Sequence, residues 1–163
     1  MTVSILKKHR LFAACLTSTL ALAPAFAQAT EAHVQVQLND YDGERAYFSV
    51  YLVNPEGRYQ STLWVSGDEE KWYPDLAAWW KYLSRAPQEL DAITGASTGA
   101  GERANLTLEI APEFIDAGYK LRVETAVEDA LNHTVDAEID LSAAKSGEKA
   151  AGTGYVRFIR YKF

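Results

Sequence analysis

The chain has 163 residues, and its 22 acidic side chains outnumber the 16 basic ones to give a formal net charge of −6. This acidic balance argues against nucleic acids and anionic lipid surfaces as partners. The single cysteine, Cys15, lies near the N-terminus, so the rest of the chain has no disulfide and no thiolate to act as nucleophile or metal ligand.

The first 27 residues have the three parts of a secretory signal peptide. Lys7, Lys8 and Arg10 form a basic region, residues 11–23 form a short apolar core, and residues 25–27 (Ala-Phe-Ala) form a small-x-small cleavage site. The apolar core is too short to span a membrane. We therefore expect residues 1–27 to be removed and residues 28–163 to remain as one exported domain, soluble in the periplasm. That domain has 13 basic and 22 acidic residues, a net charge of −9.

Seven segments of this domain alternate apolar and polar residues, which is the period of a half-buried strand. They are His33–Leu38, Arg45–Val53, Gln60–Val65, Asn105–Ile110, Tyr119–Glu124, His133–Leu141 and Tyr155–Phe163. A Pro/Gly turn at 54–57 predicts a hairpin between the second and third segments, and residues 142–152 read as a flexible connection. Short strands at these intervals predict a mainly β fold, an immunoglobulin-like β-sandwich.

The period changes to that of a helix between the third and fourth strands. Leu76, Trp79, Trp80 and Leu83 stand at i, i+3, i+4 and i+7, so they share one helical face. Prolines near both ends bound a short inserted helix at about 74–85. We expect Trp79 and Trp80 to anchor this helix on the sandwich, because large aromatic side chains bury well. Residues 72–73 (Trp-Tyr), beside acidic residues in a loop, are expected to be exposed.

Residues 91–101 (DAITGASTGAG) form a run of small residues that contains three hydroxyls and that neither a helix nor a strand requires. Gly95 and Ala96 leave the backbone accessible, so that a large partner can approach the Ser97 hydroxyl. The bland interpretation is a surface loop between two elements.

The pattern D-x-x-[ST]-G-A-[ST] in this loop resembles the acceptor motif of proteins that carry covalent FMN. In such proteins an ApbE-type flavin transferase takes FMN from FAD and joins its phosphate to a Ser or Thr hydroxyl. The acceptor is the hydroxyl residue directly after Gly-Ala, which is Ser97 here, although Thr is the usual residue. The adjacent Thr98 is the second choice.

A second resemblance covers most of the domain. An early strand, an acidic Trp-bearing loop, a Trp-Trp helix, the DAITGA loop and a GYKLRVE strand follow one another in this order. This order is similar to that of an uncharacterised family of periplasmic Ig-like proteins, which are often encoded beside PepSY-domain membrane proteins and flavin transferases. The resemblance implies a periplasmic flavin carrier, and we expect it to relay electrons with a PepSY-type membrane reductase or another redox protein as partner.

Two hypotheses concern the residues around the acceptor. Asp91 would orient the loop or contact the transferase and its metal, and Thr94 would form a hydrogen bond within the turn. The protein would be a substrate of the transferase and a redox carrier without catalytic residues of its own.

The alternative is a flavin-free periplasmic binding or accessory module of the same fold. The aromatic residues before the loop and the acidic residues 68–70 would then hold a protein or a carbohydrate. A metal site is not expected, because His33 and His133 are far apart in the sequence and neither has a second ligand at metal spacing.

Overall fold

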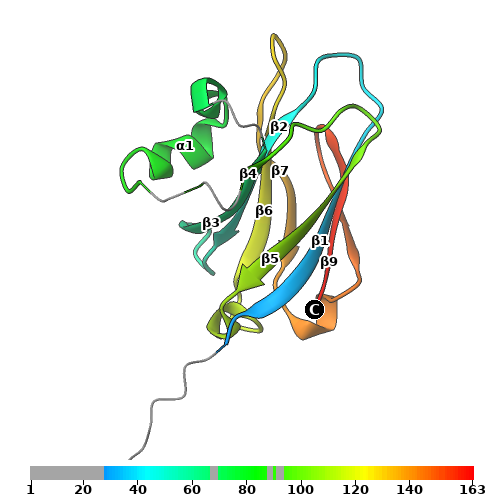
Figure 1. Cartoon of the computed structure of the whole chain (residues 1–163). Coiled ribbons are helices and arrows are strands. Elements are labelled where there is room, and N and C mark those ends of the chain that lie inside the picture. The colour runs from blue at the N-terminus through cyan, green and yellow to red at the C-terminus, as the bar shows by residue number, and fades with distance from the viewer. Residues whose placement is uncertain (1–27, 67–69, 88–89, 91–93) are drawn as a thin grey trace, which may run out of the picture.

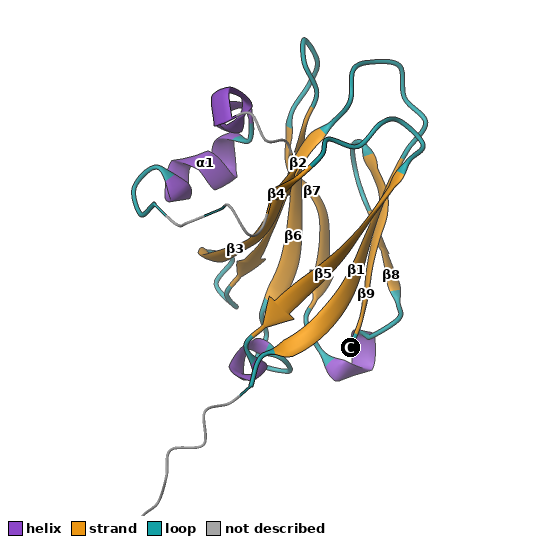
Figure 2. Ribbon diagram, viewed as in Figure 1, coloured by secondary structure: helices purple, strands orange, loops and turns teal. Residues whose placement is uncertain are grey.

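The computed structural model describes residues 28–66, 70–87, 90 and 94–163, and the predicted signal peptide lies outside these residues. The described chain forms nine strands and four helical segments (Figures 1 and 2). The strands are β1 (Thr30–Leu38), β2 (Tyr47–Val53), β3 (Tyr59–Ser66), β4 (Thr94–Gly95), β5 (Arg103–Ile110), β6 (Lys120–Ala126), β7 (His133–Asp140), β8 (Lys149–Ala151) and β9 (Val156–Lys162). The helical segments are the 3-10 helix η1 (Glu70–Asp75), the α-helix α1 (Ala77–Leu83), and the 3-10 helices η2 (Pro112–Phe114) and η3 (Ala143–Lys145).

The strands form two sheets that face each other, with the orders β5-β1-β9-β8 and β4-β3-β2-β6-β7 (Figure 2). Neighbouring strands are antiparallel except β3 and β4, which are parallel. The pairing of β1 with β5 matches strands B and E of an immunoglobulin sandwich, and the order β2-β6-β7 matches its strands C, F and G. The last long strand, β9, occupies the place beside β1 that the first strand has in that fold. The predicted mainly β sandwich is therefore confirmed.

The main core lies between the two sheets, and it follows from the alternation in the sequence. In β1, Ala32, Val34 and Val36 are buried in this core, whereas His33, which lies between Ala32 and Val34, is exposed. In β2, Val50 and Leu52 point into the same core. Removing each such side chain from water stabilises the fold by about 1.5–3 kcal/mol. The register of each strand is fixed because a slip by one residue would turn this apolar set to the solvent.

A second apolar cluster lies on the outer face of the β4-β3-β2-β6-β7 sheet, under α1. Tyr51 and Val53 point to this face, and they pack with the fully buried Trp79 of the helix. The Trp79 indole Nε1 donates a hydrogen bond to Thr62 Oγ1 at 2.8 Å. The expected anchoring of the helix is confirmed for Trp79, and Trp80 is half-buried against the same cluster.

The sequence-based boundaries of the helix were too wide. Pro74 lies in the separate 3-10 turn η1, and the backbone of Leu76 (φ −82°, ψ 67°) is not helical, so the α-helix begins only at Ala77. The expectation that Tyr73 is exposed was wrong. Its ring packs edge-on against Trp79, with centroids 5.2 Å apart, and only 3% of the residue is exposed. Trp72 is half-buried and stacks on Tyr47.

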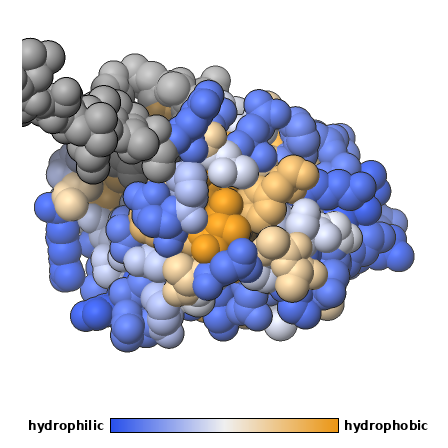
Figure 3. Space-filling model, turned by 90° about the horizontal axis from the view of Figure 1, so that it is seen from below, coloured by the Kyte–Doolittle hydropathy of each residue, from blue (hydrophilic) through white to orange (hydrophobic). Residues whose placement is uncertain are grey.

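The segment 142–152, read from the sequence as a flexible connection, contains η3 and the short edge strand β8. At this lower end of the molecule, Phe114, Ile115 and Tyr119 of the β5–β6 connection pack against the core. The surface seen from this side is mostly hydrophilic, with a small apolar area near its centre (Figure 3).

Candidate functional site

Residues 94–101 of the candidate acceptor segment run from one sheet to the other across the end of the sandwich (Figure 1). Thr94 and Gly95 pair with Val65 and Ser66 at the end of β3, and the chain then reaches Thr98. Thr98 forms a two-way backbone bridge with Ala46, at N···O distances of 2.9 and 3.2 Å. Thr98 therefore lies beside the chain that leads into β2, whereas Thr94 and Gly95 lie on the side of β3 that faces away from β2.

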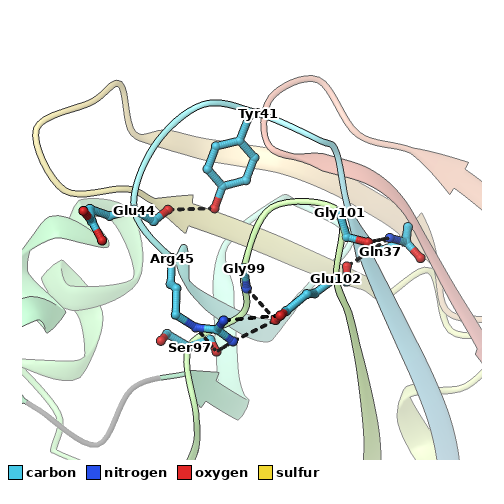
Figure 4. A network of polar contacts seen from close by, with 8 residues as sticks. All are labelled: Gln37, Tyr41, Glu44, Arg45, Ser97, Gly99, Gly101 and Glu102. Atoms are coloured by element: carbon cyan, nitrogen blue, oxygen red, sulfur yellow. Dashed lines mark hydrogen bonds and ion pairs between the residues drawn. The ribbon is translucent and has the colours of Figure 1, made fainter.

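Arg45, which lies just before β2, binds the backbone of this segment (Figure 4). Its Nε and Nη2 donate to the Ser97 carbonyl oxygen at 3.1 and 2.6 Å, and Nη2 also contacts Glu102 Oε2 at 2.7 Å. The Glu102 carboxylate in turn accepts a hydrogen bond from the Gly99 N–H at 2.8 Å. The guanidinium and the Gly99 N–H lower the pKa of Glu102 below its ordinary value, so this carboxyl stays ionised. We call Arg45, Ser97, Gly99 and Glu102 the Arg45 clamp.

The Arg45 clamp packs tightly against residue 99. A Cβ on Gly99 would lie 3.0 Å from Arg45 Nη1 and 3.1 Å from Glu102 Cδ. The next glycine, Gly101, has φ +71°, a value that residues other than glycine rarely adopt. Its N–H donates a hydrogen bond to the Asn39 carbonyl oxygen at 2.8 Å. These two glycines of the small-residue run therefore shape the turn itself.

Arg45 binds the backbone carbonyl of Ser97 and makes no hydrogen bond with its side chain. The dashed contacts in Figure 4 end on one oxygen of Ser97, the carbonyl, and the hydroxyl lies on the side away from Glu102. Within the described part of the chain, the Ser97 Oγ has no hydrogen-bond partner. Ser97 is half-buried, whereas its neighbour Thr98 is only 6% exposed. Of the two hydroxyls, that of Ser97 is the more accessible.

The other predicted site residues lie in the same segment or next to it. Thr94 and Gly95 form β4 and are half-buried, and Ala96 is exposed. Gly95 lies against the ring of Trp64. Asp91 lies outside the described residues, so its expected role stays a prediction.

Sequence reasoning missed the two charged members of the clamp. Arg45 was assigned to the start of a strand, Glu102 was assigned to no element, and the two are 57 positions apart. No periodicity links two such residues. Their contact follows only from the placement of Thr98 beside Ala46, which brings the chains on both sides together.

Glu124 of β6 fixes α1, the helix that precedes the acceptor segment in the chain. This fully buried carboxylate accepts hydrogen bonds from the backbone N–H groups of Ala78 and Trp79, at 2.9 and 2.8 Å. Burial raises the pKa of Glu124, and the two N–H donors offset part of that rise. The first turn of α1 has donors that the helix itself does not use, and Glu124 satisfies two of them.

The two histidines of the domain, His33 and His133, make separate contacts with other residues. His33 is exposed and lies 3.3 Å from Glu31, and His133 packs edge-on against Tyr155 with centroids 5.1 Å apart. No group of three or more His, Cys, Asp or Glu side chains with metal-binding geometry occurs among the residues that the structure describes.

Comparison with known proteins identifies the family of the chain. A family model described as "Predicted periplasmic protein (DUF2271)" matches residues 29–158. The chain belongs to the DUF2271 family.

The DUF2271 match spans both sheets, α1 and the acceptor segment, and it places the protein in the periplasm. None of the helices described for residues 28–66, 70–87, 90 and 94–163 has the length and apolarity that a membrane crossing requires. No curated protein and no solved structure matches the chain. Membership of DUF2271 carries no activity with it, so the function must be argued from the site.

Proposed function

We propose that this DUF2271 protein is a periplasmic electron carrier with FMN attached as a phosphoester to Ser97. The observation that carries the proposal is the Arg45 clamp. It holds the backbone of a motif that resembles a flavin acceptor, while the hydroxyl of the residue after Gly-Ala remains outside the clamp. A structural role for this hydroxyl would instead require a hydrogen-bond partner.

The attachment requires that the Ser97 oxygen reach a phosphorus atom. The Ser97 Oγ would bond to the riboflavin-side phosphorus of FAD, the bond between the two phosphates would break, and AMP would leave. The hydroxyl proton would pass to a base on an ApbE-type transferase. The exposed Ala96 next to Ser97 leaves room for that enzyme. Once attached, FMN passes electrons singly or in pairs.

Covalent attachment suits the compartment. A flavin held only by reversible contacts would be lost by dilution outside the cytoplasm, whereas a phosphoester cannot dissociate. The domain without its predicted signal peptide has no cysteine, so its electrons must be carried by a group other than sulfur. A PepSY-type membrane reductase would supply them, and an acceptor outside the cytoplasm would receive them.

The decisive experiment is an intact-mass measurement. The full chain is co-expressed with an ApbE-type transferase, secreted and purified. We expect a mass increase equal to FMN less one water, located by peptide mapping on the peptide that contains Ser97. Ser97→Ala should abolish the increase, while Ser97→Thr and Thr98→Ala should retain it. A mature chain with only its amino-acid mass, in cells with active transferase and FAD, would refute the proposal.

Asp91 provides a second test of the same proposal. We expect Asp91→Ala to abolish flavin incorporation and to leave the folded domain intact, because the proposed role of Asp91 is toward the loop and the transferase. Incorporation is measured by mass and folding by far-ultraviolet circular dichroism. Full incorporation into Asp91→Ala would remove Asp91 from the acceptor motif of this protein.

A further inference from the structure

The structure contains an apolar cavity of about 370 Å³ lined by the chain that precedes the acceptor segment. Its walls come from η1, from α1 and from the chain that leaves α1. The lining residues are Glu70, Tyr73, Trp80, Leu83, Ser84, Pro87 and Leu90. Binding sites for small molecules have volumes of about 300–1,000 Å³, mostly apolar and aromatic walls and a few polar groups. This cavity has all three properties.

The walls suit a flat aromatic ring with one polar edge. Tyr73 is buried, and its ring centroid lies 6.4 Å from that of Trp80. Trp80 is half-buried and contributes its indole to the cavity wall. Leu83 adds an aliphatic surface, and the exposed Glu70 and Ser84 place polar groups at the margin. An isoalloxazine has this shape and polarity: its benzenoid end is apolar, and its pyrimidine end carries carbonyl and N–H groups.

The cavity is connected to the acceptor by short stretches of chain on two sides. Leu90 belongs to its wall, and Thr94 is already paired to β3. On the other side Glu70 follows Ser66, the pairing partner of Gly95, by four residues. Four residues span at most about 14 Å. The Ser97 side chain also points away from Arg45, toward the side where the helical ribbon of residues 70–83 lies (Figure 4).

We propose that this cavity binds the isoalloxazine ring of the flavin carried by Ser97, with the ring stacked against Trp80. This inference rests on the proposed function. It assigns Trp80 and Tyr73 to cofactor binding, and it makes α1 the element that separates the flavin from bulk solvent. Glu124 then has an indirect role, because it fixes the helix that carries Trp80.

The competing position for the ring is the Trp64 side chain. Trp64 is also half-buried and lies directly against Gly95. The Trp64 ring already packs on Phe48, with ring centroids 4.8 Å apart. It also fills the space that a Cβ on residue 95 would occupy. The apolar cavity borders Trp80 and not Trp64, and this difference favours Trp80.

The test uses flavinylated full-length protein and compares flavin fluorescence before and after proteolysis to the Ser97 peptide. Stacking on an indole quenches this fluorescence, so we expect the intact protein to be several-fold dimmer than its own peptide. Trp80→Leu should restore several-fold brighter emission, and Ser84→Trp, which fills the cavity from its exposed margin, should expose the flavin to iodide. Tyr82→Leu is the matched control, because Tyr82 lies on the same helix, stacks on Tyr59 and does not line the cavity.

Intact mass, recorded for every sample, separates the two proposals. A flavinylated protein as bright as its peptide, with Trp80→Leu unchanged, overturns docking in the cavity and leaves the carrier function standing. Brightening in Trp64→Phe with none in Trp80→Leu overturns it in favour of the other indole. A chain without FMN overturns both proposals.

Discussion

Gly95 lies directly beneath the ring of Trp64. A Cβ built on Gly95 would be 2.6 Å from Trp64 Cζ2, closer than such atoms approach in folded proteins, and 3.3 Å from Cε2. The sequence suggested that Gly95 keeps the backbone open to a large partner. The structure gives it a further and more immediate task, because the absent Cβ is the space that the indole fills.

The first prediction concerns this contact. Gly95→Ala should destabilise the domain by about 1–3 kcal/mol, the cost of inserting a methyl group into a packed site. The free energy of unfolding from urea denaturation measures the loss. Ala96→Ser is the control, since Ala96 is exposed and its replacement should change stability by less than about 0.5 kcal/mol.

A double variant shows whether the clash with Trp64 is the cause. Phenylalanine lacks the part of the indole that reaches Gly95, so Trp64→Phe should reduce the cost of Gly95→Ala. The double variant would then lose less stability than the two single variants together. Strict additivity would mean that Gly95 is required for a reason other than the Trp64 ring.

The second prediction concerns the Arg45 clamp. Arg45→Gln removes the guanidinium that binds the Ser97 carbonyl and the Glu102 carboxylate. We expect the initial rate of FMN incorporation by limiting transferase to fall several-fold, because the acceptor segment loses its fixed position. The thermal midpoint should change little, since exposed ion pairs contribute little to stability.

The matched control for the clamp is Arg58→Gln. Arg58 also pairs with a carboxylate, Glu56 at 3.6 Å, but it is highly exposed and lies in the β2–β3 turn. Its replacement should leave the incorporation rate unchanged. Equal rates for wild type and Arg45→Gln would show that the transferase positions the segment by itself.

The long strands and the helix could be predicted because each depends on its own local pattern. Alternation placed Val50 and Leu52 on one face of β2 and Tyr51 on the other, and the structure has this split. The same pattern predicted a half-buried strand, whereas both faces are buried because α1 covers the outer one. Two-residue β4 has no period to detect, and Tyr73 is buried only because η1 folds back onto Trp79.

Glu124 shows why part of the site could not be predicted. In the sequence it alternates with Leu121 and Val123 and therefore belongs to the polar face of β6. That face is covered by α1, so the side chain is buried and binds the helix backbone. Which face a helix covers is a long-range property, and the alternation within one strand contains no information about it.

The third prediction is that Glu124→Gln weakens the attachment of α1. An amide has one acceptor oxygen, so one of the two backbone N–H groups of Ala78 and Trp79 loses its partner. A buried donor left without an acceptor costs about 1–3 kcal/mol, and relief of the burial of a charge offsets part of this cost. Urea denaturation at neutral pH measures the balance, with the exposed Glu109→Gln as control.

The pH dependence of this variant has a defined sign. Because burial raises the pKa of Glu124 above 4.5, the folded state binds the proton more tightly than the unfolded state. The stability of wild type relative to Glu124→Gln should therefore increase as the pH falls from neutral through the folded-state pKa, and it should level off below about 4.5. A difference that decreases over this range would show that the folded carboxyl has a lowered pKa.

The fourth prediction is that Glu138→Gln has the opposite dependence on pH. Burial alone would raise the pKa of Glu138, but hydrogen bonds from Lys120 Nζ and Arg122 Nε, both at 2.8 Å, outweigh it and lower the pKa below 4.5.

The ionised folded state is thus favoured, and the stability that Glu138 contributes is present above its unfolded-state pKa. The advantage of wild type over Glu138→Gln, about 1–3 kcal/mol at neutral pH for hydrogen bonds to a charged group, should disappear as the pH falls through the folded-state pKa. Denaturation curves between neutral pH and pH 3 measure it, with the exposed Glu113→Gln as control. An advantage that persists at the acid end would mean that the contacts of Glu138 with Lys120 and Arg122 do not depend on its charge.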